Sequence, residues 1–331
     1  MLSNRKISVV WNLLKIIFAI ALVWYFLSWV DLGELYDLWE RVRISHLLAT
    51  IALYSILTLL KAYRYQQILI EQKTRYLRVL NIVVLQNSIS NFLANSAGLA
   101  SFLALLHIEE NVKVRKSGLT FVIIKIGDLF AVWLFSIVCS FLLWNRVGEL
   151  HSAILFFLVL VGIGFVFFFL ALFWRRVFIS LANRVMFLLK LTRFSFFRQV
   201  VDALEAFAEM PQSMVFTIVY KAFGLSLIYN FITLIWMVVS MNAFQLPVDA
   251  LSILFVSCIL QLFTMIPVSV FGGLGITEVT SLYLYTLLGV PSTELSIILV
   301  GWRILYYVTN LLLVLYLPIY ALFIEPKISS K

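Results

Sequence analysis

Long stretches of the chain carry no charged side chain, and this feature limits the fold more than any other. Residues 151–174 contain no Asp, Glu, Lys or Arg, and a helix needs about 20 apolar residues to cross the ~30 Å hydrocarbon core of a bilayer. The whole chain is 63% hydrophobic and 12% charged, whereas a soluble domain has about 25% charged residues. The sequence therefore predicts an all-α polytopic membrane protein.

Hydropathy predicts six full membrane spans and two interrupted apolar regions. The spans are residues 9–30, 46–62, 118–144, 151–174, 214–241 and 294–323. Residues 81–107 contain a cluster of Asn, Ser and Gly, and residues 251–289 contain the sequence PVSVFGGLGITE at 267–278. Non-helical backbone at membrane depth needs cover from protein or a cavity. We therefore expect each interrupted region to be a re-entrant helical hairpin.

The basic residues predict that both termini are cytoplasmic. Lys and Arg collect on the cytoplasmic flanks of membrane spans, and 19 of the 25 lie on the inside that this layout assigns. They are Arg5, Lys6, Lys15, Lys61, Arg64, Lys73, Arg75, Arg78, Lys113, Arg115, Lys116, Arg175, Arg176, Arg184, Lys190, Arg193, Arg198, Lys327 and Lys331. We expect a multi-pass protein of the cytoplasmic (inner) cell membrane, with residues 9–30 retained as the first helix.

The same layout predicts an inverted repeat. Residues 1–145 give span, span, hairpin from the inside and span, while residues 151–325 give span, span, hairpin from the outside and span. Repeats of this kind are typical of secondary transporters, although any chain of apolar helices admits some pseudo-symmetry. Residues 177–210, between the halves, mix Phe, Leu and Met with basic residues. They suit an amphipathic segment in the cytoplasmic interface or a linker between the repeats.

Ionisable residues inside the predicted membrane segments are the first candidates for a functional site. They are Lys125, Asp128, Lys221, Glu278 and Arg303. A charge at the centre of a span costs about 2.5–3.5 kcal/mol on insertion scales, so it normally faces a partner or water. Lys125 and Asp128 are three residues apart on one helix face, and a local ion pair is their simplest interpretation. Lys221 is close enough to the end of its span to extend toward the head groups.

The glycine motif predicts an anion site near Arg303. The amide N–H groups of Gly272, Gly273 and Gly275 at a helix start, with the positive end of the helix dipole, favour anions such as phosphate. Glu278 in the first turn would repel a phosphate unless it pairs with Arg303. We expect this ion pair either as a structural clamp or as part of the substrate site.

The first hairpin offers uncharged polar groups instead. Its amides and hydroxyls belong to Asn87, Ser88, Asn91, Asn95 and Ser96. These groups suit the hydroxyls of a sugar or glycerol, or the backbone of the hairpin itself, and Gly98 is expected to allow a sharp turn. Asn91 and Asn95 are the candidate substrate-binding residues.

Neither a metal site nor a cofactor nor a catalytic centre is predicted. The three His residues have no partner at zinc spacing, and both Cys residues lie in apolar runs. The sequence also offers no paired carboxylates and no nucleophile with a nearby base.

The chain resembles the lysylphosphatidylglycerol-synthase transmembrane family of flippase-like membrane domains. PVSVFGGLGITE and GWRILYYVTNLLLVL around Arg303 look like the family's proline, paired glycines and glutamate and its arginine on the last helix. IKIGDLF, with Lys125 and Asp128, is similar to the family's basic residue three positions before an aspartate. The first hairpin departs from the family, because the usual proline, and the acidic and arginine residues after the glycine, are missing.

The resemblance implies movement of lipids between leaflets, with aminoacylated phospholipids and polyprenyl-phosphate-linked sugars among the family's substrates. Members that make lysylphosphatidylglycerol carry a soluble aminoacyl-transfer domain, which we expect these 331 residues to lack. We therefore expect a transporter of a lipid with an anionic, phosphate-bearing head group, not an enzyme. The alternatives are an intramembrane enzyme on lipid-linked phosphate or sugar, with Glu278 as general base, and an accessory subunit of a glycosyltransferase or envelope enzyme. No nucleic-acid partner is expected, and homo-oligomer formation is left open.

Overall fold

The computed structural model describes residues 32–40, 42–69, 74–92, 95–174, 210–264 and 276–317, together with positions 177, 180 and 184. Every regular element in these ranges is helical, which confirms the all-α fold class. The predicted span 9–30, nearly all of the segment 177–210 and the three glycines of the motif lie outside the described residues.

Five described helices are long and apolar enough to cross a membrane. They are α3 (Ile44–Ile68), α6 (Val114–Leu142), α7 (His151–Phe173), α10 (Gln212–Ala243) and α13 (Ser292–Val314). These helices match five of the six predicted spans. The largest difference at a described end is in α3, which continues past residue 62 to Ile68, while the predicted end of the last span at residue 323 lies outside the described residues.

Two pairs of shorter helices occupy the regions predicted as hairpins. α4 (Tyr76–Phe92) and α5 (Asn95–Glu110) have 17 and 16 residues, and α11 (Ala250–Thr264) and α12 (Ile276–Leu287) have 15 and 12. At 1.5 Å per residue each helix is roughly 18–26 Å long, less than the ~30 Å of a hydrocarbon core. α4 packs against α5, and α11 packs against α12. The re-entrant geometry of both pairs stays a prediction.

Gly98 lies within α5 and not in a sharp turn, so the role expected from the sequence is wrong. A Cβ atom at this position would overlap Oγ of Ser90 and lie 2.9 Å from the carbonyl oxygen of Gln86, both on α4. Only a residue without a side chain permits this approach. Gly98 therefore sets the spacing between the two helices of the first pair.

The turn between α12 and α13 follows directly from its sequence. Gly289 has a φ of +90°, a left-handed conformation that glycine adopts readily. The N–H of the next residue, Val290, donates to the carbonyl of Tyr285 at 3.1 Å and closes the end of α12. Pro291 then precedes α13, where its missing N–H costs no helical hydrogen bond. This turn places Glu278 of α12 and Arg303 of α13 on adjacent helices.

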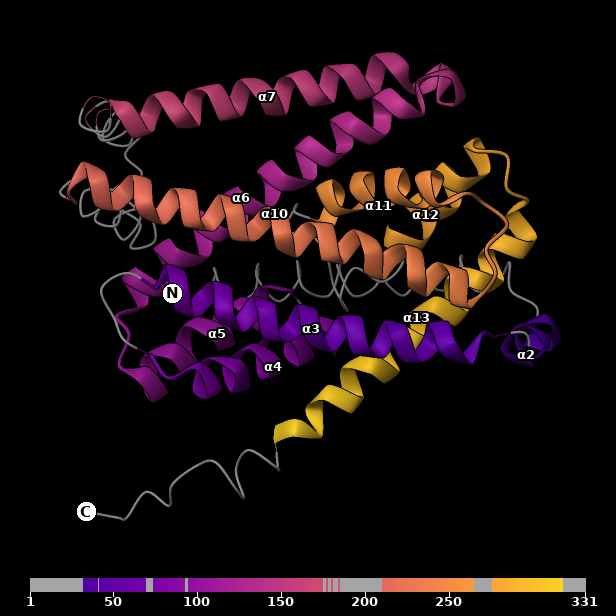
Figure 1. Ribbon diagram of the computed structural model, residues 1–331, viewed down its shortest axis with the longest axis horizontal. Coiled ribbons are helices and arrows are strands. Elements are labelled where there is room, and N and C mark those ends of the chain that lie inside the picture. Colours follow the sequence, from indigo (N-terminus) through magenta and orange to yellow (C-terminus); the bar gives the residue numbers. More distant parts are fainter. Residues whose placement is uncertain are drawn as a thin grey trace, which may run out of the picture.

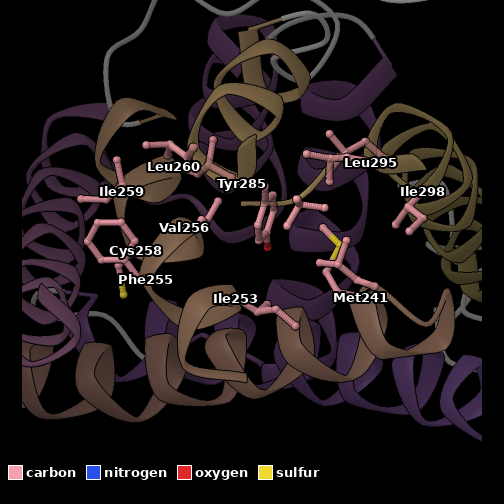
Figure 2. Close-up of a cluster of buried hydrophobic side chains, with 14 of the residues drawn as sticks. Met241, Ile253, Phe255, Val256, Cys258, Ile259, Leu260, Tyr285, Leu295 and Ile298 are labelled. Atoms are coloured by element: carbon pink, nitrogen blue, oxygen red, sulfur yellow. The ribbon is translucent and has the colours of Figure 1, made fainter. Parts of the chain in front are cut away.

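α10 is the central helix of the described chain. It packs against α3, α6, α11 and α13. Figure 1 shows α7 along one edge of the molecule and α3, α4 and α5 toward the opposite edge, with α10 between them. One apolar cluster joins α10 to α11, α12 and α13 (Figure 2), and a second joins α10 to α3, α4, α5 and α6. The short helix α2 (Leu32–Glu40) packs on α13, and the 3-10 turns Trp144–Arg146 and Gly148–Leu150 connect α6 to α7.

Candidate functional site

A cavity of about 730 Å³ lies among α3, α4, α5, α6, α10 and α13. This volume is within the range of about 300–1,000 Å³ that is usual for small-molecule sites. Its lining residues are Tyr54, Leu57, Thr58, Lys61, Tyr65, Gln86, Asn87, Ser90, Asn91, Ser96, Leu99, Phe121, Val122, Lys125, Ile126, Leu129, Tyr229, Thr233, Trp236 and Tyr306. The cavity therefore combines aromatic and aliphatic walls with amides, hydroxyls and two ammonium groups.

Lys61 and Lys125 supply the charge of this cavity. Lys61 donates a hydrogen bond from Nζ to Oδ1 of Asn87 on α4, at 2.6 Å. Lys125 has its Nζ 5.8 Å from the centre of the Phe121 ring. Neither neighbour is an anion, and none of the described lining residues is Asp or Glu. Both ammonium groups therefore face the cavity without a carboxylate among the residues that line it.

A buried ion pair lies beside the cavity. Arg64 of α3 donates from Nη2 to Oδ1 of Asp128 on α6 at 2.6 Å, and the two side chains are 2% and 11% exposed. Asn230 of α10 donates to the same oxygen at 3.2 Å. The guanidinium of Arg64 also lies over the ring of Tyr229, 4.3 Å from its centre. The pair ties α3 to α6 and α10, the three helices that form most of the cavity wall.

This geometry corrects two predictions from the sequence. Asp128 pairs with Arg64, and no ion pair joins it to Lys125 within the described chain. Lys61 and Arg64, counted above among the cytoplasmic flanking charges, belong to α3, where Arg64 is buried and Lys61 lines the cavity. The physical reason is that α3 continues as a helix past residue 62, and Asp128 stabilises the charge that α3 then buries.

A network of hydrogen bonds closes the cavity on the side of α13. Asn91 of α4 donates to Oδ1 of Asn310 at 2.6 Å, and Tyr54 of α3 donates to the same oxygen at 2.8 Å. The hydroxyl of Tyr306 donates to Oδ1 of Asn91 at 2.8 Å. Four side chains from three helices thus satisfy one another, as buried polar groups require. Asn91, a predicted binding residue, both lines the cavity and belongs to this network.

The second buried ion pair joins α12 to α13, as the sequence predicted. Oε1 of Glu278 lies 3.4 Å from Nε of Arg303, and the side chains are 3% and 9% exposed. Thr277 donates to the other carboxylate oxygen at 2.8 Å. The guanidinium carbon of Arg303 lies 5.6 Å from the ring centre of Tyr306 and 5.1 Å from that of Tyr307. Tyr306 therefore contacts both this ion pair and the cavity.

The remaining predicted site residues are dispersed. Lys221 is exposed near the start of α10 and is not among the residues that line the cavity. Asn95 is the first residue of α5, and its side chain lies outside the described part of the structure. Gly272, Gly273 and Gly275 lie outside it as well. Whether the glycine amides face the cavity stays a prediction.

Arg64 and Lys61 are the functional candidates that sequence reasoning missed, and a signal for them was present. Polar and aromatic residues recur along α3 at positions 54, 58, 61 and 65, with Arg64 beside the last of them. Spacings of three and four place such residues on one helix face. That stripe continues past residue 62, the predicted end of the span, and so indicated a longer helix.

Comparison with known proteins identifies the family of this chain. A family model described as "Lysylphosphatidylglycerol synthase TM region" matches residues 12–313. Comparisons with curated proteins and with solved structures found no significant match. Because the family match covers most of the chain, the protein belongs to the lysylphosphatidylglycerol synthase transmembrane family.

Proposed function

We propose that this member of the family is a lipid transporter that moves a phosphate-bearing lipid between the leaflets of the membrane. The observation that carries the proposal is the cavity with Lys61 and Lys125 in its lining, surrounded by four of the five candidate membrane helices. Cations at this depth are costly and normally mark a pathway or a partner. An anionic head group in the cavity would be that partner.

The size and polarity of the cavity support the binding of a head group rather than of a whole lipid. Its ≈ 730 Å³ can take a phosphate with a small polar substituent. Asn87, Ser90 and Thr233 add neutral hydrogen-bonding groups beside the two lysines. The hydrocarbon chains would remain among the exposed apolar side chains of the outer helix faces, such as Val138 on α6, which is 54% exposed and does not line the cavity. Only the polar part of the lipid then needs a protein site.

The two hairpin regions take different parts in this proposal. α4 and α5 supply Gln86, Asn87, Ser90, Asn91 and Ser96 to the cavity lining. α11 and α12 supply none of the described lining residues, and Glu278 reaches the cavity only through Arg303 and Tyr306. In our proposal helices α4 and α5 bind the head group. The ion pair between Glu278 and Arg303 holds α13, and with it Tyr306, in place.

A liposome assay tests the proposal. The purified protein is reconstituted with phosphatidylglycerol, phosphatidic acid or a polyprenyl phosphate in one leaflet, and the sidedness of the head groups is followed with a membrane-impermeant reagent. We expect faster exchange than in protein-free liposomes and a loss of at least about tenfold in Lys61→Gln/Lys125→Gln. Lys221→Gln removes a lysine outside the cavity lining and should retain the wild-type rate.

Two results would contradict the proposal. Exchange equal to that of protein-free liposomes for all three lipids would show that the protein does not transport them. Mass spectrometry could instead detect chemically altered lipids. If Glu278→Gln abolished this alteration, the protein would be an intramembrane enzyme.

A further inference from the structure

We propose that the head group carried by this protein has two negative charges, as in a phosphomonoester or a diphosphate, and not the single charge of a phosphodiester. This inference rests on the proposed function and specifies its substrate class. It comes from the charge balance of the cavity and of the residues directly beside it.

The count of charges is simple within the described residues. Three cations, Lys61, Arg64 and Lys125, and one anion, Asp128, lie in or beside the cavity. Arg64 and Asp128 neutralise each other at 2.6 Å, so three positive charges less one negative charge leave two. Lys61 and Arg64 are three residues apart on α3, Lys125 and Asp128 are three apart on α6, and the Arg64–Asp128 pair joins the two helices, so the four groups form one cluster.

A dianionic ligand matches this surplus. An ammonium in a low-dielectric site is costly until an opposite charge compensates it. A ligand with one negative charge would leave one of the two lysines uncompensated, whereas a phosphomonoester would compensate both. The hydrogen bond from Lys61 to Asn87 fixes the ammonium on the side of α4 but adds no negative charge. It orients the lysine without removing its preference for an anion.

The same balance disfavours a lipid with a positively charged head group. An amino group on an aminoacylated phospholipid would meet Lys61 and Lys125 and would find no acidic side chain among the described lining residues. Asp128 is already bonded to Arg64 and Asn230. The cavity of this chain therefore selects against a cationic substituent on the phosphate.

Two matched short-chain lipids test the charge assignment by isothermal titration calorimetry on the full-length protein in a non-ionic detergent. Dioctanoyl phosphatidic acid and dioctanoyl phosphatidylglycerol have the same chains, but only the first is a phosphomonoester. A phosphomonoester has a second pKa of about 6, so it carries close to two charges at pH 7.5 and one at pH 5. We expect phosphatidic acid to bind about tenfold more tightly at pH 7.5 and less than about threefold more tightly at pH 5.

Phosphatidylglycerol keeps its single charge between pH 5 and pH 7.5, so any change in its own affinity over this range measures the titration of protein groups in the cavity. The ionisable groups that face Lys61 and Lys125 are Arg64, Asp128, Tyr54, Tyr65, Tyr229 and Tyr306. Lys61→Gln and Lys125→Gln should each remove most of the preference for phosphatidic acid. Lys221→Gln, outside the cavity lining, should retain it.

The outcomes separate the two proposals. Equal affinity of the wild-type protein for the two lipids at pH 7.5 would overturn the dianion assignment and leave lipid transport standing. Tighter binding of a dioctanoyl lysylphosphatidylglycerol than of phosphatidic acid would overturn it as well. If no short-chain lipid binds and no lipid moves in the liposome assay, the proposed function itself fails.

Discussion

Two buried arginine–carboxylate pairs lie in the described part of the chain, and their surroundings differ. Arg64 and Asp128 lie 2.6 Å apart, with Asn230 on the carboxylate and two lysines nearby. Arg303 and Glu278 lie 3.4 Å apart, against the rings of Tyr306 and Tyr307. Each pair joins helices that are distant in sequence or separated by a turn. Within the described residues, surplus charge and a cavity lie beside the first pair.

The comparison shows that a buried charge indicates function only together with what lies around it. A pair that lies against aromatic rings, such as Glu278–Arg303, has no net charge for a ligand to compensate. A pair beside further cations leaves a net charge, which a ligand can compensate. In our proposal the head-group site therefore lies in the region of α3, α4 and α6, and the region of α12 and α13 has a supporting role.

The largest expected effect comes from breaking the first pair. Asp128→Ala leaves Arg64, 2% exposed, without its carboxylate and in a cluster with Lys61 and Lys125. Breaking a buried pair from one side costs about 3–5 kcal/mol. We expect a loss of this size in the free energy of unfolding, measured by denaturation in detergent micelles. Arg64→Leu/Asp128→Ala should recover much of it, because neither member of the pair is left without the other.

The second pair should respond less. Glu278→Gln leaves Arg303 with the faces of Tyr306 and Tyr307, and cation–π contacts stabilise a desolvated cation by about 0.5–2 kcal/mol. We expect a loss of about 1–3 kcal/mol in the same denaturation experiment. If the loss equals that of Asp128→Ala, the distinction between the two regions is wrong.

Transport measured on the same variant separates the two roles of Glu278. For a clamp, the exchange rate in liposomes should fall only as far as the folded fraction falls. A rate that drops about tenfold in a fully folded Glu278→Gln protein would place Glu278 in the substrate site.

Much of the fold could be predicted from the sequence, because in lipid the apolar length of a segment nearly determines its structure. Long apolar runs predicted the five described spans, and the two regions interrupted by Asn, Ser and Gly contain the shorter described helices α4, α5, α11 and α12. The ends of the helices were harder to predict. α3 runs on to Ile68 because Asp128, distant in sequence, stabilises Arg64, and hydropathy contains no information on such a partner.

The site was predictable only where charges stand alone in apolar surroundings. Glu278 and Arg303 lie in long apolar runs, so each needed a partner and the sequence offered the other. Arg64 stands in the polar stretch KAYRYQQ, where a solvated flank was the natural interpretation. The error with Lys125 and Asp128 has a different origin. A spacing of three shows that two charges share a helix face, not that a stronger partner on another helix is absent.

Packing within the first hairpin region gives a smaller effect with a close control. In Gly98→Ala the new methyl group meets Ser90 and the backbone of Gln86, so we expect a loss of about 1–3 kcal/mol. Gly118→Ala, on α6, meets no atom within 4 Å and should gain up to about 1 kcal/mol from helix propensity. Denaturation of both variants measures the difference. Equal stabilities would show that α4 and α5 are not held as closely as described.

The smallest effect is expected at the exposed pair between Arg146 and Asp249, which completes the comparison. Its atoms are 3.0 Å apart, but the side chains are 62% and 46% exposed, so solvent screening leaves about 0–0.5 kcal/mol at pH 7. A hydrogen bond from Ser252 and the charge of Arg146 lower the pKa of the Asp249 carboxyl. A lowered pKa stabilises the folded state at a pH above the unfolded value of about 3.9, and this stabilisation is lost as pH falls through the lower pKa of the folded state. Thermal unfolding of Arg146→Ala should therefore lie within about 1–2 °C of wild type at pH 7, and the difference should disappear once the pH is below that folded-state pKa. A large shift in the unfolding temperature at pH 7 would mean that distance alone sets the strength of these ion pairs. The contrast between Arg64–Asp128 and Arg303–Glu278 would then not come from their surroundings.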